Sequence, residues 1–120
     1  MDPSLLHQVV WNLCQNGILH GAQEGKPVQL RLSGGRSTTS RSAHLDIMDN
    51  GPGVEPDMID TIFEPFFTTN GSGTGLGLYI AREICERHQA RLDYLPAAGG
   101  GSCFRITFPD TETMSASAFA

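Results

Sequence analysis

The apolar residues of this 120-residue chain change their spacing from a helical repeat to strict alternation, and this change occurs twice. Helical spacing predicts amphipathic helices, whereas alternation predicts strands that bury one face. The expected elements, in chain order, are a helix over 4–21, strands over 27–33 and 43–49, a short helix over 55–63, a helix with Leu76, Tyr79, Ile80 and Ile84 on its apolar face, and strands over 91–95 and 102–108. This order favours an α/β sandwich with helices on one face of a sheet.

Length and charge exclude several classes of protein. The chain carries 8 Lys+Arg and 13 Asp+Glu, a formal net charge of −5, without the clustered cations that phosphate backbones require. No apolar run approaches the roughly 18 residues of a membrane span, and no signal-peptide pattern opens the chain. We expect one domain over residues 1–110 with a disordered tail over 111–120, and neither nucleic acid nor a membrane among its contacts.

Cysteine and histidine usage argues against a disulfide framework and a zinc site. The three cysteines, Cys14, Cys85 and Cys103, form no C-x-x-C pair, and the four histidines lack metal-ligand spacing. The cysteines are expected to be small buried apolar residues of a protein in a reducing cytosol.

Glycine is enriched, at 14 of 120 residues, and six of the glycines fall in two short segments. One segment is a turn after the strand over 43–49, and the other is an alternating run before the second helix; they hold Gly51, Gly53, Gly71, Gly73, Gly75 and Gly77. None of these six is followed by Lys as in a Walker A motif. The Rossmann G-x-G-x-x-G and the nucleophile elbow G-x-S-x-G are also absent. All three motifs are therefore rejected.

Asp49 is the strongest single candidate for a functional residue. Alternation places it on the same side of its strand as Leu45 and Ile47, which is the apolar side. A carboxylate aimed into a core costs free energy unless something hydrogen-bonds it. The alternative is a strand-end Asp that starts the sharp turn Asn50-Gly51-Pro52-Gly53.

Three polar residues, Asn12, Asn16 and His20, lie four residues apart on one face of the first helix. Asn is a poor helix former, so two on one face are unusual. The amide oxygen of Asn16 is a suitable ligand for a hard cation such as Mg²⁺. The alternative is a pair of solvent-exposed asparagines.

Four motifs occur in a fixed order: Asn12-x-x-x-Asn16, Asp49-x-Gly51-x-Gly53, Phe63-x-x-Phe66-Phe67 and Gly73-Thr74-Gly75-Leu76-Gly77-Leu78. Together they resemble the ATP-binding catalytic domain of bacterial sensor histidine kinases, in the superfamily that includes gyrase, Hsp90 and MutL. The resemblance runs from Leu5 to Phe108 and is greatest to kinases that act on NtrC-type response regulators, the type IV pilus sensor kinases among them. It implies a Bergerat fold: a two-layer α/β (α+β) sandwich with an ATP lid, whose mixed, mostly antiparallel sheet of about five strands is covered on one face by about three helices.

The resemblance also implies roles for individual residues. Asn16 would bind Mg²⁺, Asn12 would support the ion and the phosphates, and Asp49 would accept a hydrogen bond from the adenine amine. Phe63, Phe66 and Phe67 would form the hinge of the lid. The other residues implied to contact ATP are His20, Gly51, Gly53, Thr68, Thr69, Gly73, Thr74, Gly75, Leu76 and Gly77, with Phe67 shared between hinge and site.

The implied activity is that of a histidine kinase. The domain would bind Mg-ATP and supply the γ-phosphoryl group to a histidine on a separate dimerisation domain, from which an NtrC-class response regulator would receive it. Asn12 stands where hydrolysing relatives have a Glu base for water, and an amide does not take that proton at neutral pH. No histidine here lies in an H-box, so the phospho-acceptor and sensor domains are expected outside this sequence, in a homodimeric protein anchored in the inner membrane with this domain in the cytoplasm.

Two departures from the family concern charge. Leu19 stands where sensor kinases usually carry Lys or Arg, and residues 51–80 contain neither. Mg²⁺, backbone amides and either His20 or Arg82 are left to neutralise the triphosphate, so we expect a modest ATP affinity. Two alternatives stay open: a weak or degenerate nucleotide-binding regulatory module, and a serine kinase or ATPase of the same superfamily.

Overall fold

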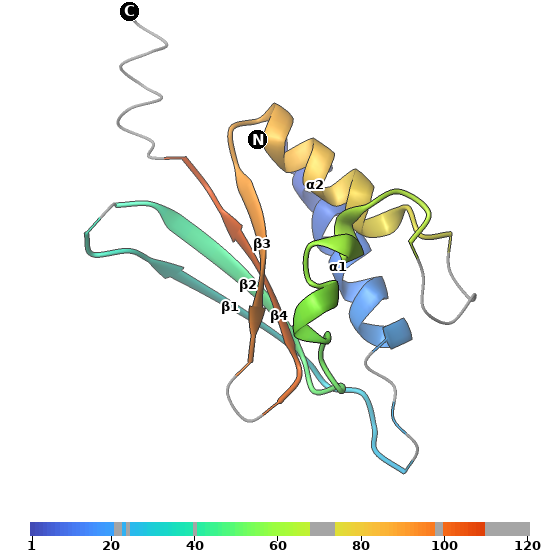
Figure 1. The fold of residues 1–120 in the computed structure, drawn as a ribbon. Helices are drawn as coiled ribbons and strands as arrows, with labels where there is room; N and C mark the ends of the chain where they lie inside the picture. The colour runs from blue at the N-terminus through green and yellow to red at the C-terminus, as the bar shows by residue number, and fades with distance from the viewer. Residues whose placement is uncertain (21–22, 24, 40, 68–73, 98–99, 110–120) are drawn as a thin grey trace, which may run out of the picture.

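The computed structural model describes residues 1–20, 23, 25–39, 41–67, 74–97 and 100–109. Within these residues two α-helices, two 3₁₀ turns and four strands follow one another along the chain (Figure 1). They are α1 (Pro3–His20), β1 (Leu30–Arg36), β2 (Ala43–Asp49), η1 (Pro56–Met58), η2 (Thr61–Phe63), α2 (Gly77–Arg87), β3 (Arg91–Pro96) and β4 (Ser102–Thr107).

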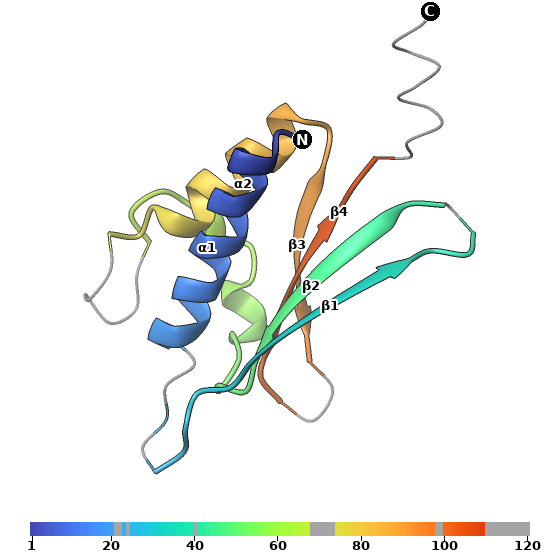
Figure 2. The ribbon, with the colours of Figure 1, turned by 180° about the vertical axis from the view of Figure 1, so that it is seen from behind.

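The strands form one sheet in the order β1-β2-β4-β3, and each neighbouring pair is antiparallel. Both helices lie on the same face of this sheet, and no element of the described residues covers the opposite, open face (Figures 1 and 2). The two-layer sandwich expected from the sequence is therefore confirmed. Over the described residues the sheet has four strands rather than about five and is antiparallel throughout, and the segment expected as a third helix consists of the two short turns η1 and η2.

Strand β1 begins later than the alternation predicts, and it continues through Gly34 and Gly35, beyond the expected end at residue 33. The side chain of Asn50 explains the late start, because it donates to the Pro27 carbonyl at 3.0 Å and accepts the Gln29 N–H at 2.9 Å. At the far end, a Cβ on Gly35 would lie 2.8 Å from Nε2 of His44. The imidazole thus uses the space that a side chain would fill, and the glycine is part of the strand.

The hydrophobic core lies between the two helices and the sheet. Its most deeply buried members come from both layers and include Val9, Leu13, Ala81, Cys85, Leu92, Phe104 and Ile106. The buried face of α2 follows Ala81 and Cys85, so Tyr79, which was expected on that face, is 36% exposed. All three cysteines are free; Cys85 and Cys103 are buried as expected, whereas Cys14 is only partly buried, and burial raises the pKa of the Cys85 thiol to about 11.

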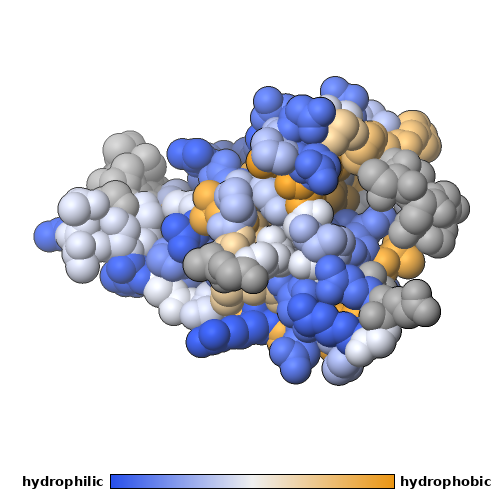
Figure 3. All heavy atoms as spheres, turned by 60° about the horizontal axis from the view of Figure 1, so that its bottom comes forward, coloured by the Kyte–Doolittle hydropathy of each residue, from blue (hydrophilic) through white to orange (hydrophobic). Residues whose placement is uncertain are grey.

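The surface is mostly hydrophilic on the face shown in Figure 3, where hydrophobic side chains form small, separate areas. The most exposed large apolar residues of the described chain are Trp11, Ile18, Leu32 and Phe66. None of the helices described is both long enough and apolar enough to cross a membrane.

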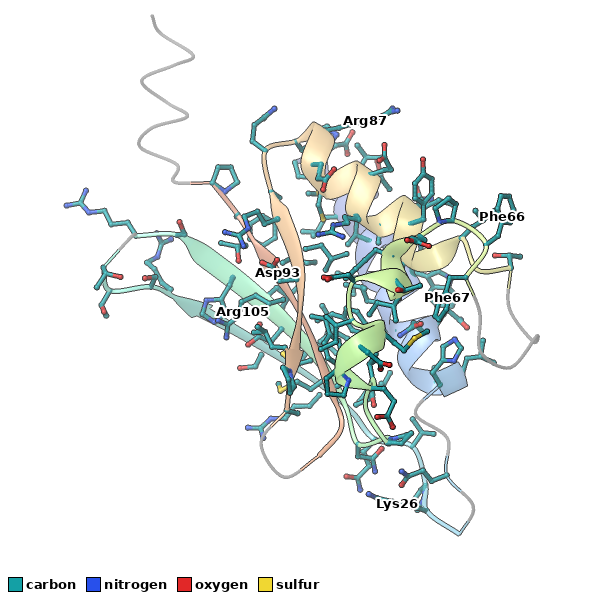
Figure 4. The ribbon with its side chains drawn as sticks, in the orientation of Figure 1. Lys26, Phe66, Phe67, Arg87, Asp93 and Arg105 are labelled. Atoms are coloured by element: carbon teal, nitrogen blue, oxygen red, sulfur yellow. The ribbon has the colours of Figure 1, made fainter. Side chains whose placement is uncertain are left out.

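On the open face of the sheet, Arg105 of β4 holds Asp46 of β2 through two hydrogen bonds of 2.8 and 2.9 Å (Figure 4). Asp46 is 9% exposed, and Nε2 of His44 lies 3.9 Å from its carboxylate. Hydrogen bonding to the Arg105 guanidinium lowers the pKa of the Asp46 carboxyl below its ordinary value. This bidentate ion pair joins the two central strands, β2 and β4, where Asp46 and Arg105 lie opposite each other in the register.

Replacing Arg105 with Met is expected to lower the free energy of unfolding by about 2 kcal/mol at neutral pH, because it leaves a nearly buried carboxylate unpaired. Since the pair lowers the folded-state pKa of Asp46, its stabilisation is present above the unfolded pKa and is lost as the pH falls through the folded one. Urea unfolding from neutral pH to about pH 3 should therefore show the two proteins converging in acid. Arg91→Met is the control, because the Arg91–Asp93 pair is largely exposed and its loss should cost at most about 0.5 kcal/mol. An equal effect of both variants would contradict the assignment.

Candidate functional site

A cavity of about 320 Å³ opens where the end of α1 and the end of β2 meet the segment that carries η1 and η2. This volume lies within the range of about 300–1,000 Å³ that is typical of small-molecule sites. Its lining residues are Asn16, Leu19, His20, Asp49, Pro52, Gly53, Val54, Glu55, Met58, Ile62, Phe67, Leu78, Ser102 and Phe104. The cavity thus brings together residues from all four motifs: the first helix, the strand end, the aromatic segment and, through Leu78, the segment at the start of α2.

Asp49, the last residue of β2, lines this cavity, as its position on the apolar side of the strand predicts. Its Oδ1 accepts the backbone N–H of Gly51 at 2.9 Å. Burial is the largest influence on the carboxyl and raises its pKa above the ordinary value, against the lowering effect of the Gly51 and Ser102 amides and of His20. Asp49 is therefore a half-buried acceptor that backbone amides hold in place.

Gly17 determines how closely α1 approaches the sheet beside Asp49. A Cβ at this position would lie 2.7 Å from Cδ2 of Leu30 and 3.5 Å from Cβ of Asp49. The missing side chain therefore lets the helix pack against the strands at the point where Asn16 and His20 face the cavity. In the sequence this glycine appears only as one more small residue on the buried face of the helix.

The three polar residues on the expected face of α1 do not act as one group in the structure. Asn16 and His20 line the cavity, whereas Asn12 does not. The side-chain amide of Asn12 instead donates to the carbonyl of Gly77, the first residue of α2, at 3.3 Å. Asn12 therefore joins the two helices beside the cavity, and a direct contact of Asn12 with a ligand stays a prediction.

The turn after β2 shows why two glycines occur there. Gly51 is buried behind Asp49 and supplies the N–H that the carboxylate accepts. Gly53 has a φ of +79° and lines the cavity, and a Cβ on it would lie 3.0 Å from the carbonyl oxygen of Gly101. Gly53 thus brings the backbone close to the cavity wall, whereas Gly51 does not line the cavity, and contact of either glycine with a ligand stays a prediction.

The lid segment is only partly within the described residues. Thr68, Thr69 and Gly73 lie outside them. At the near end of α2, Oγ1 of Thr74 accepts the Leu76 N–H at 3.3 Å, and Gly75, with a φ of +73°, accepts the Phe66 N–H at 2.8 Å. Of the residues expected at the phosphates, Thr74, Gly75, Leu76 and Gly77 do not line the cavity, although the next residue, Leu78, does.

The aromatic residues of the third motif have three different environments. Phe63 is buried and packs edge-to-face on Phe104, with ring centroids 6.1 Å apart. Phe67 lines the cavity, while Phe66 is 72% exposed and projects from the molecule near the start of α2 (Figure 4). Phe66 also has a φ of +66°, a conformation that its hydrogen bond to Gly75 holds.

Basic side chains are scarce at the cavity. Arg82, one of the two cations expected to serve it, lies with its guanidinium carbon 4.4 Å over the Phe63 ring and pairs with Glu86 at 3.4 Å. It does not line the cavity, and His20 is the only basic residue among the described lining residues. The two acidic lining residues are Asp49 and Glu55.

Several lining residues have no signal in the sequence motifs. Val54, Met58 and Ile62 reach the cavity because the segment after the glycine turn folds into short 3₁₀ turns, and Ser102 and Phe104 reach it because β4 pairs with β2. The register places Ser102 opposite Asp49, which only the strand order β1-β2-β4-β3 could reveal. Within the described residues no group of three or more His, Cys, Asp or Glu side chains could hold a metal ion. Ligation of Mg²⁺ by the Asn16 amide remains a prediction.

Comparisons with known proteins agree with the motifs. Over residues 1–112 the chain matches the family described as histidine kinase-, DNA gyrase B- and HSP90-like ATPase. It is 50% identical over 115 residues to the sensor protein kinase PilS of Pseudomonas aeruginosa, an alignment that covers 96% of this chain and 22% of PilS. The chain therefore spans about a fifth of the length of that relative.

Solved structures show the same architecture. The catalytic domain of the histidine kinase ThkA superimposes with a TM-score of 0.75 at 29% identity, covering 91% of this chain and 68% of that one. Full-length ShkA in complex with AMPPNP superimposes with a TM-score of 0.71 at 29% identity, covering 90% of this chain and 22% of that one. The expected resemblance to sensor histidine kinases is confirmed, and the chain belongs to the family of histidine kinase-, DNA gyrase B- and HSP90-like ATPases.

Proposed function

We propose that this chain is the nucleotide-binding domain of a sensor histidine kinase, which binds Mg-ATP and supplies the γ-phosphoryl group for phosphorylation of a histidine on a separate dimerisation domain. The observation that carries the proposal is the carboxylate of Asp49, a half-buried acceptor at the cavity wall with backbone amides behind it. A fixed acceptor in a largely apolar cavity favours a ligand that brings a hydrogen-bond donor.

An adenine ring suits the Asp49 end of the cavity. Its exocyclic amine supplies the donor that Asp49 lacks, whereas the carbonyl of guanine at the same position would face the carboxylate with a second acceptor. Met58, Ile62 and Phe104 provide apolar walls for the ring. A Cβ on Gly53 would lie 3.0 Å from the Gly101 carbonyl oxygen, so glycine at this position lets the cavity wall pack closely on the turn before β4.

The phosphates would be held at the α1 side of the cavity. Asn16 offers an amide oxygen of the kind that Mg²⁺ accepts, and His20 is the basic side chain on the same helix face. Asn12 would act from the side, where it fixes the first residue of α2 and with it a helix N-terminus that favours anions. Mg²⁺, when bound, would neutralise phosphate charge and orient the transferred group.

Transfer to a side chain is favoured over hydrolysis because Asn12 has no basic group to accept a proton from water. The acceptor histidine would belong to the dimerisation domain of the same homodimeric protein, and an NtrC-class response regulator would receive the phosphoryl group from it. Similarity to one fifth of a sensor kinase supports this arrangement, with the domain over residues 1–110 in the cytoplasm and the parent protein anchored in the inner membrane.

The test is to mix this chain with the dimerisation domain of its parent protein and ATP labelled at the γ-phosphate. Label should appear on the dimerisation domain and disappear when its acceptor histidine is replaced, while the chain alone should release little phosphate. Steady phosphate release by the chain alone would instead favour an ATPase. Nucleotide binding without label on the partner would favour a regulatory binding module, the second candidate, which the scarcity of basic lining residues supports.

The affinity for ATP in the presence of Mg²⁺ is expected to be modest, with a dissociation constant above about 1 µM by calorimetry. Residues 51–80 contain no Lys or Arg, and Arg82 packs on Phe63 outside the cavity lining. Charge-assisted bonds to the phosphates are therefore few. A sub-micromolar dissociation constant would contradict this expectation, and replacing Leu19 with Arg should tighten binding if phosphate charge is what limits it.

A further inference from the structure

Tyr94 lies directly behind the wall of the cavity without lining it. It belongs to β3, is 8% exposed, and sits opposite Phe104 of β4, with the two rings edge-to-face and their centroids 5.4 Å apart. Phe104 lines the cavity, so the Tyr94 ring supports the wall from behind. None of the four sequence motifs includes this tyrosine.

The hydroxyl of Tyr94 connects two segments that do line the cavity. It accepts the backbone N–H of Val54 at 2.9 Å and lies 3.3 Å from Oγ of Ser102. Because a backbone N–H only donates, the Tyr94 oxygen is the acceptor in the first bond and its own proton is free for the second. Either hydroxyl can donate in this second bond; in the arrangement in which Tyr94 donates, Oγ of Ser102 is the acceptor and the hydroxyl proton of Ser102 is left to donate to another group.

Ser102 can present that proton to a ligand. It is 6% exposed, lines the cavity and pairs in register with Asp49. Its backbone N–H also helps to hold the Asp49 carboxylate. The wall therefore presents an acceptor, Asp49, next to a donor, Ser102, and the direction of the donor depends on Tyr94.

We infer that Tyr94 is a positioning residue for base recognition, which directs the Ser102 hydroxyl as a donor toward the ring nitrogen N1 of adenine. This nitrogen lies beside the exocyclic amine, from which Asp49 accepts a hydrogen bond. This inference rests on the proposed binding of an adenine nucleotide. The Asp49 acceptor matches the adenine amine, which donates, and the Ser102 donor matches adenine N1, which accepts. Guanine has a carbonyl acceptor and an N1–H donor at these two positions, so both contacts would be mismatched. Tyr94 does not line the cavity, so it acts on recognition through Ser102 and does not touch the base.

The test compares ADP with 1-deaza-ADP, which lacks the N1 acceptor, by calorimetry on the 120-residue chain. Tyr94→Phe keeps the ring and removes only the hydroxyl, so ADP affinity should fall about fivefold while 1-deaza-ADP affinity changes less than about twofold. Ser102→Ala should have the same selective effect. The double variant should bind ADP no more weakly than Ser102→Ala alone, because Tyr94 acts through the serine.

Tyr79→Phe is the matched control, since Tyr79 is the only other tyrosine, is 36% exposed and does not line the cavity. It should leave both affinities unchanged. Equal weakening of ADP and 1-deaza-ADP by Tyr94→Phe, or no weakening, would overturn the positioning role but leave adenine binding intact. If the wild-type chain binds no ADP, the proposed function fails as well. If Tyr94→Phe does not fold, Ser102→Ala decides, because a non-selective effect of that variant also overturns the inference.

Discussion

Replacing Asp49 with alanine is expected to lower the affinity for ATP at least about a hundredfold while leaving the domain folded. The carboxylate is the acceptor at the cavity wall, and backbone amides of Gly51 and Ser102 hold it there. Without the carboxylate the adenine amine would have no hydrogen-bond acceptor in the cavity, and the amides of Gly51 and Ser102 would lose their acceptor as well. Calorimetric titration with ATP measures the loss of affinity, and urea unfolding measures the stability of the same sample.

Stability should change little because burial raises the pKa of Asp49. For an acid whose folded pKa lies above its unfolded pKa, the favourable contribution is present below the unfolded pKa and is lost as the pH rises through the folded one. At neutral pH ionisation of this carboxyl therefore costs folding free energy, and its removal offsets the hydrogen bonds that the Gly51 and Ser102 amides lose, so we expect Asp49→Ala to stay folded. By the same shift, ATP affinity should weaken as the pH falls through the raised pKa and the acceptor becomes protonated.

Asp46→Ala is the matched control for Asp49→Ala. Both aspartates belong to β2, but Asp46 pairs with Arg105 on the open face, while Asp49 lines the cavity. The control should be less stable, because it breaks a nearly buried ion pair, and it should bind ATP within about twofold of the wild type. Wild-type affinity in Asp49→Ala, or an equal loss in both variants, would refute the assignment of the adenine acceptor.

The position of Asp49 could be predicted from the sequence because strand geometry is local. A period of two residues fixes which side chains share a face, and β2 has the bounds that the alternation predicts. The bounds of β1 could not be predicted in the same way. They depend on Asn50, which is more than 20 residues away in the sequence and bonds to Pro27 and Gln29.

The division of the polar residues on α1 shows a second limit. Asn12, Asn16 and His20 share a helix face by spacing alone, and that inference is correct as local geometry. The environment of each side chain depends on elements later in the chain. Asn12 donates a hydrogen bond to the first residue of α2, whereas Asn16 and His20 line the cavity beside β2. In the same way Ser102 and Tyr94 become parts of the site only through pairing of β3 and β4 with β2, so periodicity alone gives no sign of them.

Gly101 is a position where a single added methyl group should damage both the fold and the site. It has a φ of +91°, and a Cβ there would overlap the carbonyl oxygen of Asp49. Because the backbone fixes the position of a Cβ and its partner is a backbone oxygen, no side-chain rotation could relieve the overlap, and β4 would have to move away from the end of β2. We expect Gly101→Ala to lower the free energy of unfolding by about 3 kcal/mol in urea titrations.

Gly100→Ala separates the overlap from the backbone conformation. Gly100 has a similar φ of +100°, but a Cβ there would have no neighbour within 4 Å, so only conformational strain should appear, at about 1 kcal/mol. Equal destabilisation by the two variants would show that the overlap with Asp49 is relieved at no cost. A large difference would mean that the turn before β4 is held against the end of β2. Gly101→Ala should then also weaken ATP binding, since the displaced carbonyl belongs to Asp49, the residue proposed to accept a hydrogen bond from the adenine amine.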